Sequence, residues 1–274
     1  MSAFPETLDR TTTGARRGWR SDLALIGWQV AYEQRAFWRN RTRAFFSFGM
    51  PIMLLLLFAS LNSGHIEQLN NIPYVVFFLP GIMAYGIIIT QFVNMAGGLA
   101  IQRDSGLLKR MRGTPLPGWA YVAGRVGSTA LSSVTMAAVM LILGRVFYDV
   151  HVSAAGLAAV AVAVLLGAAT FAALGMAAVT IIPNAEAAPV VANVLILPLS
   201  FISGIWYPMT DAPTWLLDVA KVFPIQRLAD ALQTAFDPVN HGSAFAGNDL
   251  LILAIWLAAG VRLAMVFWRR ETAR

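Results

Sequence analysis

The chain has no cysteine among its 274 residues, and only 12% of its residues are Asp, Glu, Lys or Arg. Without cysteine there are no disulfide bonds and no thiolate metal sites. Soluble domains carry about 25% charged residues, so this scarcity of charge excludes an ordinary soluble domain. Apolar residues instead make up 58% of the chain, and several apolar runs reach the ~18 residues that a bilayer-crossing helix needs. The composition indicates a polytopic helical membrane protein.

Sequence signatures of catalysis are also missing. No G-x-x-x-x-G-K-[ST] phosphate loop occurs, so the chain does not hydrolyse ATP by that route. His65, His151 and His241 are far apart, and none has metal-ligand spacing to another histidine or to a carboxylate. The G-x-S-x-G frame is absent, and the apolar runs contain no carboxylate pair. We therefore expect no catalytic residue, no metal site and no cofactor bound by this chain.

Basic residues give the chain a net charge of +6 and a pI near 10.2. They lie mainly in loops beside apolar runs, which indicates orientation in a lipid bilayer better than it indicates phosphate binding, so no nucleic-acid partner is expected. Residues 1–20 lack the apolar core of a cleavable signal peptide and are predicted to be a flexible cytoplasmic N-terminus.

Residues 21–43 are predicted to form an amphipathic helix in the membrane interface. Ser21 and Asp22 suit a helix start, and an apolar stripe with tryptophans then leads to a basic end. The alternative is a soluble helix packed on a partner.

The predicted fold is all-α, with a transmembrane domain over residues 44–268 and a short cytoplasmic tail, 269–274. Six transmembrane helices are expected, at about 44–61, 74–101, 119–143, 154–182, 190–206 and 250–268. Segment 207–249 is external but not polar. Stretches that begin at Trp215 and Leu228 are typical of short re-entrant or surface amphipathic helices that cap a cavity.

Charge asymmetry orients these spans. Six spans put both termini on one side, together with 17 of the 20 Lys and Arg residues and the loop 102–117. Only Arg145, Lys221 and Arg227 fall on the other side. The positive-inside rule then places the termini and the loop in the cytoplasm. Arg125 and Arg262 lie near cytoplasmic span ends and are expected to snorkel towards the interface.

The loop 102–117, QRDSGLLKRMRGTPLP, combines several features in order. Leu107, Leu108 and Met111 can form an apolar knob surrounded by basic side chains, and Thr114–Pro117 ends the helix and stiffens the approach to the next span. On its charge alone, this loop would be interpreted only as a positively charged cytoplasmic loop that fixes the membrane topology. The ordered pattern favours a lever that engages an acidic cleft on a partner.

This loop resembles the first cytoplasmic loop of ABC-2 type exporter permeases, where a short helix docks on a separate ATPase subunit. The run from Ser203 through Pro208, followed by Phe223-Pro-Ile-Gln-Arg-Leu, is similar to the family's second hallmark. Trp38-Arg-Asn-Arg-Thr-Arg with Pro51 resembles the start of its first span. The likeness covers about residues 23–268 and is nearer the drug- and antibiotic-resistance branch than the polysaccharide branch. One departure is Gln102, where the family usually has an acid; Asp104 or the partner would have to compensate.

The resemblance implies a bacterial inner-membrane (plasma-membrane) exporter. Two copies of this chain, or one copy with a related permease, would form a pathway, and two cytoplasmic ABC ATPase subunits carrying ATP and Mg would dock below. The cargo would be an amphipathic or hydrophobic compound, such as a drug, an antibiotic or a lipid-like molecule. Alternatives are export of a glycan or glycolipid by the same fold, or a non-transporting membrane anchor or assembly subunit.

The resemblance also implies three sets of site residues. The ATPase-coupling set is Gln102, Arg103, Asp104, Gly106, Leu107, Leu108, Lys109, Arg110, Met111 and Arg112. Translocation pathway candidates, which could equally hold helices together, are Gln91, Asn94, Asn193 and Ser200. External gate candidates are Gly204, Tyr207, Pro208 and Trp215.

Overall fold

A computed structural model describes residues 19–62, 64–66, 72–107, 110, 118–210, 212–237 and 243–273. Within these ranges the chain is helical, except for turns and one two-stranded antiparallel sheet. In that sheet β1 (His65–Ile66) pairs with β2 (Ile72–Pro73), with His65 opposite Pro73. The all-α fold class predicted from the composition is confirmed.

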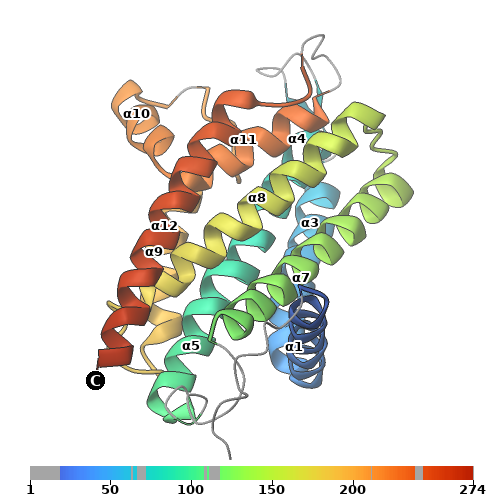
Figure 1. Cartoon of the computed structure of the whole chain (residues 1–274). Helices are drawn as coiled ribbons and strands as arrows, with labels where there is room; N and C mark the ends of the chain where they lie inside the picture. Colours follow the sequence, from blue (N-terminus) through green and yellow to red (C-terminus); the bar gives the residue numbers. More distant parts are fainter. Residues whose placement is uncertain are drawn as a thin grey trace, which may run out of the picture.

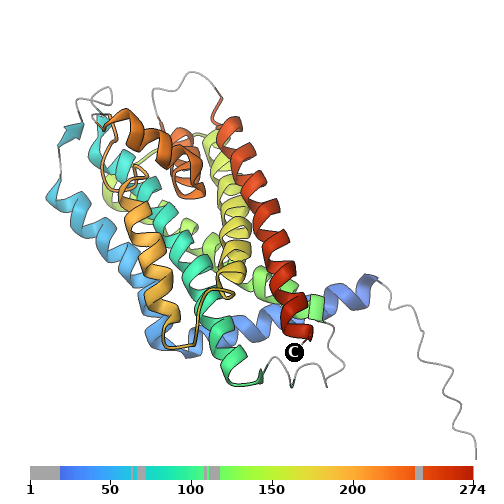
Figure 2. The same ribbon diagram turned by 90° about the vertical axis from the view of Figure 1, so that its left-hand side faces the viewer.

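The chain begins with α1 (Trp19–Arg39), which runs across one end of the bundle at a steep angle to the long helices (Figure 2). Its surface exposes Leu23, Trp28 and Tyr32, with 57%, 74% and 66% of each side chain accessible. The opposite side packs on the long helix α7 (Gly118–Tyr148). An exposed aromatic stripe on a helix that lies across the bundle end is the expected interfacial arrangement.

Asn40 separates this helix from the first membrane-crossing segment. Its side-chain oxygen accepts a hydrogen bond from the backbone N–H of Arg43 at 3.0 Å and caps α2 (Arg41–Ala44). A π-helical segment, η1 (Phe45–Gly49), and α3 (Met50–Leu61) continue α2. α1 therefore ends at Arg39, whereas the predicted interfacial helix extends to residue 43, and the first apolar segment starts at Arg41.

The second apolar segment is the centre of the bundle (Figure 1). It consists of α4 (Tyr74–Ile88), the π-helical η3 (Ile89–Val93) and α5 (Asn94–Asp104). Its most apolar stretch is 83% buried, against 11% for the corresponding stretch of α12 (Gly247–Ala273). The second span is thus surrounded by protein, whereas α12 exposes most of its apolar surface.

Three further helices complete the bundle: α7, α8 (Ala154–Ala178) and α9 (Ala188–Phe201). Within the described residues, five helical segments are long and apolar enough to cross a membrane: Arg41–Leu61, Tyr74–Asp104, Ala120–Tyr148, Ala154–Ala178 and Gly247–Val266. The remaining predicted span corresponds to α9, whose 14 residues rise only about 21 Å. A hydrocarbon core is about 30 Å thick, so α9 is the one predicted span that falls short.

Two short helices precede the last span, as predicted. The first, α10 (Thr214–Val222), lies at the surface and exposes Trp215, Val219 and Val222. The second, α11 (Pro224–Phe236), packs against α4, α8 and α12 and is largely buried (Figure 1). We call the end of the bundle that holds α10 and α11 the pocket end. The opposite end, with α1 and the last turn of α5, is the loop end.

Candidate functional site

The predicted coupling segment begins where α5 ends. Ser105 closes the helix, and Gly106 takes a left-handed backbone (φ +69°) that reverses the chain. Leu107 then exposes 41% of its side chain. The backbone N–H of Arg110 donates to the Gly106 carbonyl at 3.1 Å. Four members of the predicted set lie outside the described residues: Leu108, Lys109, Met111 and Arg112.

Arg103 does not project towards a partner as the lever hypothesis expected. Its guanidinium donates to the carbonyls of Val179, Ile182 and Pro183 at 3.0 to 3.1 Å. These carbonyls follow the end of α8, where unpaired C=O groups and the helix dipole favour a cation. Arg103 therefore ties the end of α5 to the end of α8.

Asp104 adds a second connection from the end of α5, to the turn that leads into α9. One carboxylate oxygen accepts the Ala185 backbone N–H at 2.6 Å, and the other pairs with Arg103 at 3.1 Å. Ala185 belongs to the turn that leads into α9. We call Arg103 and Asp104 with residues 179–185 the α5 brace. It joins the start of the coupling segment to both α8 and α9.

Gln102 faces a second partner, α7. Its side-chain carbonyl accepts a hydrogen bond from the Tyr121 hydroxyl, which in turn accepts one from Arg125 at 2.9 Å. Arg125 is only 4% exposed, and its Nε lies 3.2 Å from the Met95 sulfur. The expectation that Arg125 snorkels is wrong, because the space beside Gly98 and the Tyr121 hydroxyl hold it inside the bundle.

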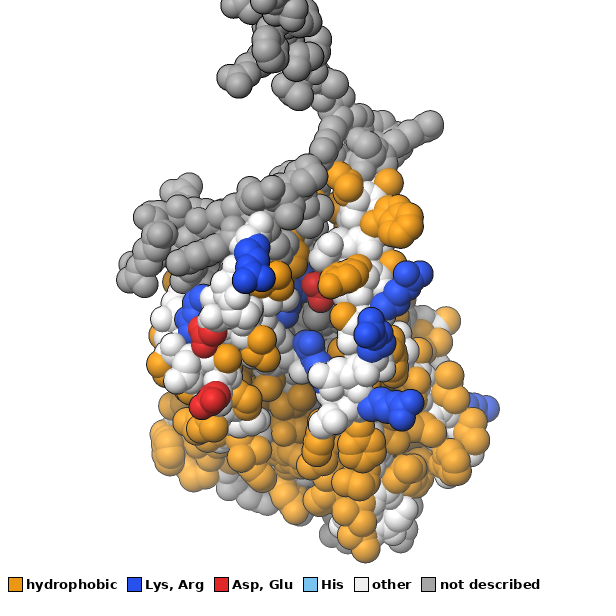
Figure 3. Space-filling model, turned by 90° about the horizontal axis from the view of Figure 1, so that it is seen from below, with side chains coloured by type: hydrophobic (Ala, Val, Ile, Leu, Met, Phe, Trp, Pro, Cys, Tyr) orange, Lys and Arg blue, Asp and Glu red, His pale blue; other side chains and the backbone are white. Residues whose placement is uncertain are grey.

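The loop end carries basic side chains around a hollow (Figure 3). Among the described arginines, Arg35 and Arg39 of α1, Arg41 of α2 and Arg110 of the predicted coupling segment are exposed. A positive rim of this kind suits an acidic partner surface or anionic headgroups.

The predicted pathway residues on the second span are internal. Gln91 is fully buried in η3 and donates to Ser133 of α7 at 2.7 Å. Asn94 donates to Ser47 at 2.9 Å and accepts from Arg43 at 3.2 Å. Both amides therefore join helices within one chain, which was the alternative reading of these residues.

The α9 candidates point in different directions. Asn193 is exposed, and among the described residues its side chain donates to the Pro189 carbonyl of its own helix at 2.9 Å. Ser200 is buried and accepts the indole N–H of Trp206 at 3.2 Å. The four predicted pathway residues are thus not brought together within one chain.

The predicted external gate is a tight turn after α9. Gly204 has φ +66°, and its carbonyl accepts a hydrogen bond from Gln233 of α11 at 2.9 Å. The next carbonyl, of Ile205, lies so close to Gly81 that an added Cβ would approach it to 2.5 Å. Pro208 lines a pocket with Gly204, whereas the side chains of Tyr207 and Trp215 are 63% and 66% exposed.

Trp206 is a residue that the sequence reasoning did not single out. Its ring lies 5.2 Å from Tyr85, 5.6 Å from Phe201 and 6.4 Å from Phe78, measured between ring centroids. This cluster anchors the turn to the central helix. Its position after a Gly within an aromatic-rich run was the available signal.

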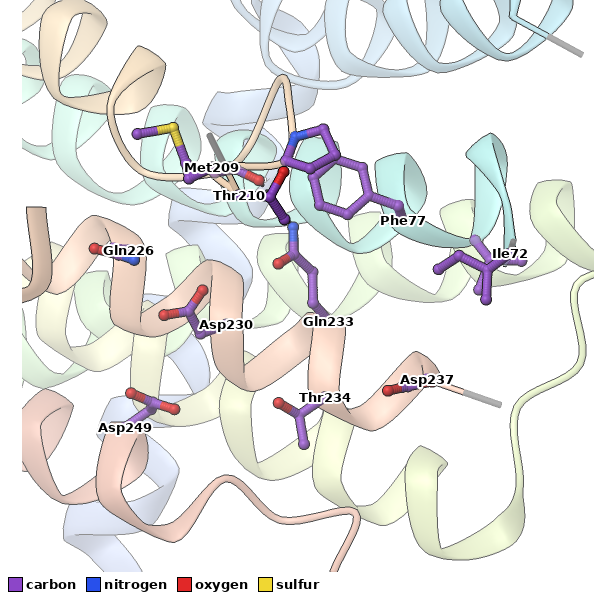
Figure 4. A pocket seen from close by; sticks show the side chains of 13 residues that line it. Ile72, Phe77, Met209, Thr210, Gln226, Asp230, Gln233, Thr234, Asp237 and Asp249 are labelled. Atoms are coloured by element: carbon purple, nitrogen blue, oxygen red, sulfur yellow. Dashed lines mark hydrogen bonds between the residues drawn. The ribbon is translucent and has the colours of Figure 1, made fainter. Parts of the chain in front are cut away.

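A pocket of about 540 Å³ opens beside this turn, between α11, the start of α4 and loop residues 204–210 (Figure 4). We call it the α11 pocket. Its polar wall includes Asp230, which the sequence reasoning also missed. Burial and repulsion from Asp249 raise the pKa of Asp230 to about 7. Asp249 itself pairs with Arg227 at 2.7 Å.

Comparison with known proteins agrees with this architecture. The model of the ABC-2 type transporter family matches residues 25–236. YvfS of Bacillus subtilis (strain 168), named a transport permease, is 21% identical over 226 residues, covering 82% of this chain and 90% of that protein. The inner membrane transport permease YadH of Escherichia coli (strain K12) is 20% identical over 208 residues, covering 74% and 78%. The family match, together with the several apolar helices, establishes that the chain belongs to the ABC-2 type transporter family and is a multi-pass transmembrane permease subunit.

Proposed function

We propose that this chain is the permease of an ATP-driven exporter that moves an amphipathic or hydrophobic compound, such as a drug, an antibiotic or a lipid-like molecule, out of a bacterial cell. The loop end and both termini lie in the cytoplasm, as the distribution of basic residues supports. Two copies of a separate ATPase subunit, which bind ATP and Mg, supply the energy. A second copy of this chain, or a related permease, completes the pathway.

The observation that carries this proposal is the α5 brace. Arg103 and Asp104 connect the first residues of the coupling segment to the end of α8 and the start of α9. Gln102 connects the same turn to α7 through Tyr121. A force applied at Leu107 therefore reaches three helices through hydrogen bonds rather than through a flexible linker.

Movement at the loop end could reach the pocket end through α9. The Gln233 amide of α11 holds the Gly204 carbonyl at the end of α9. Movement of α9 at the loop end would pull on this contact and on the aromatic cluster around Trp206. In this mechanism ATP-driven closure of the ATPases moves α8 and α9 against α4, and the turn Gly204–Pro208 opens or closes the outer side.

The proposal is tested by co-expressing the chain with an ABC ATPase encoded beside it. We expect the two to co-purify, and ATP hydrolysis in proteoliposomes to be coupled to cargo movement. Leu107→Asp and Leu108→Asp should each abolish the coupling, because a carboxylate replaces apolar contact surface. Leu107→Met and Leu108→Met are matched controls that keep an apolar side chain.

Two results would contradict the proposal. One is cargo transport by this chain without any ATPase partner. The other is unchanged ATPase binding and ATP hydrolysis when Leu107→Asp and Leu108→Asp are combined in one variant. Cargo and direction are tested separately, by comparing accumulation of labelled amphipathic compounds in cells with and without the chain.

A further inference from the structure

The α11 pocket has two chemically different walls. Ile72, Val76 and Phe77 from β2 and α4 form an apolar wall, joined by Met209 from the loop. The facing wall consists of polar side chains from α11, and Figure 4 shows Gln226, Asp230, Gln233 and Thr234 along that helix. Their spacing of three and four residues puts them on one helical face. An amphipathic ligand matches such a pocket.

One polar group in this wall has no partner. The Gln226 side chain is 8% exposed, and its Oε1 accepts no hydrogen bond from any residue that the structure describes. A buried carbonyl without a donor costs about 1–3 kcal/mol, so such groups are normally satisfied. The oxygen is buried behind the pocket wall, so an N–H donor on a bound ligand would satisfy it once the amide turns towards the pocket.

Asp230, one helical turn further on, lacks a neutralising partner as well. Within the described residues it makes neither a hydrogen bond nor a salt bridge. The nearby Arg227 is engaged by Asp249 at 2.7 Å, and Lys221 pairs with Asp218 on the surface at 3.4 Å. The pocket lining therefore includes one carboxyl group, that of Asp230, to which no described basic group is bound.

We propose that the α11 pocket binds an organic ammonium group joined to an apolar body. The ammonium donates to the Asp230 carboxylate, and the Gln226 amide turns so that its Oε1 accepts a second hydrogen bond. The apolar body lies against Val76, Phe77 and Met209. A metal ion fits less well, because the described residues contain no group of three His, Cys, Asp or Glu side chains able to hold one. Assigning this ligand as the exported cargo rests on the function proposed above; the binding itself does not.

The test uses isothermal titration calorimetry on the purified full-length chain in lipid nanodiscs, without an ATPase. The probe is 2-phenylethylammonium, and 2-phenylethanol is its uncharged match. We expect the ammonium to bind at least about tenfold more tightly than the alcohol at pH 8, because the ammonium forms an ion pair with the Asp230 carboxylate, whereas the alcohol donates from a neutral group. Using the permease alone separates this result from the ATPase-coupling test, so either proposal can fail without the other.

Two variants locate the site. Asp230→Asn should weaken ammonium binding at least about tenfold and leave alcohol binding unchanged. Gln226→Leu should weaken ammonium binding while preserving the shape of the wall. Asp218→Asn on the exposed α10 is the matched control and should bind like the wild type.

Ammonium binding should also depend on pH. The charged groups that face Asp230 are Asp249, Arg227 and Lys221, and burial raises the pKa of Asp230 to about 7. Binding requires the ionised carboxylate, so affinity should rise about tenfold from pH 6 to pH 8, and Asp230→Asn should remove this rise. The inference is overturned by wild-type-like binding in Asp230→Asn, by equal affinity for the alcohol, by no binding at all, or by displacement of the ammonium by Mg²⁺ or Ca²⁺.

Discussion

The two ends of the molecule differ in whether their polar side chains have hydrogen-bond partners. At the loop end, Arg103 and Asp104 satisfy each other, three carbonyls and a backbone N–H. At the pocket end, Gln226 Oε1 and Asp230 make no hydrogen bond to a described residue. Satisfied hydrogen bonds make a packed region more rigid, whereas an unsatisfied buried polar group costs free energy. This difference underlies the two proposals, a coupling site at the loop end and a ligand site at the pocket end.

The largest expected effect concerns the free energy that the folded protein loses when the unpaired Asp230 carboxyl group ionises. Because the folded-state pKa of Asp230 is raised from 3.8 to about 7, the folded protein holds the proton more tightly than the unfolded chain. The free energy of unfolding should therefore fall between about pH 4 and pH 7 and stay low above it, by up to about 4 kcal/mol. Asp230→Asn should recover this loss at pH 8 and change little at pH 4. Equilibrium unfolding in detergent across this pH range measures it, and equal stability of variant and wild type at pH 8 would contradict the assignment.

The next largest effect is expected from a substitution that removes the hydrogen bonds of the α5 brace. Arg103→Ala removes three hydrogen bonds and an ion pair and leaves the residue 179–183 carbonyls without a donor. We expect unfolding to become easier by about 3 kcal/mol, together with loss of ATPase coupling. Arg110→Ala removes an exposed arginine of the same segment and serves as control. If both variants melt alike, the brace is not a structural unit.

A smaller effect compares two glycines on the central span. At Gly81 an added Cβ would lie 2.5 Å from the Ile205 carbonyl, whereas at Gly97 nothing lies within 4 Å. Gly81→Ala should destabilise the protein by about 2 kcal/mol by displacing the turn after α9. Gly97→Ala should be neutral, or stabilise the helix by about 0.5–1 kcal/mol. Thermal unfolding of both variants measures the difference, and similar melting temperatures would mean that the turn adapts freely.

The smallest expected change in stability comes from a substitution that adds a negative charge at the loop end. Arg125 is buried beside Tyr121, which hydrogen-bonds Gln102, and it has no salt bridge to any carboxylate in the described part of the chain. Gln102→Glu introduces the acid that is usual in the family and should raise the free energy of unfolding by about 1 kcal/mol at pH 7. Gln102→Met, which removes the acceptor, should lower it. A destabilised Glu variant would show that the cluster prefers a neutral acceptor.

The helices at the pocket end show how far sequence reasoning reached. Both α10 and α11 were predicted as amphipathic pieces, and both exist. Their periodicity could not distinguish α10, which exposes Trp215, from α11, which the bundle buries. The difference depends on which neighbour covers the apolar face, and that is a long-range contact absent from local spacing.

The coupling residues show a similar limit. The pattern of basic residues, Gly and leucines predicted a coupling segment at residues 102–112, and it did not predict where Arg103 points. The acceptors of Arg103 are carbonyls of residues 179–183, about 80 positions away in the chain. Backbone carbonyls carry no sequence signature, so this partner was invisible. Arg125 illustrates the same point, since its burial depends on the small Gly98 on another helix.

The sequence by itself determined that this protein is a helical, multi-pass membrane permease of its family, because apolar run length, scarce charge and loop motifs are local properties. The tertiary structure decided which polar residues are satisfied. Arg103 and Asp104 connect α5 to the residues after α8. Gln91 and Asn94 hydrogen-bond to neighbouring helices, whereas Gln226 Oε1 and Asp230 have no hydrogen-bond partner among the described residues. The physical reason is that a hydrogen bond needs a partner within about 3 Å, and only the packed helices determine which groups meet.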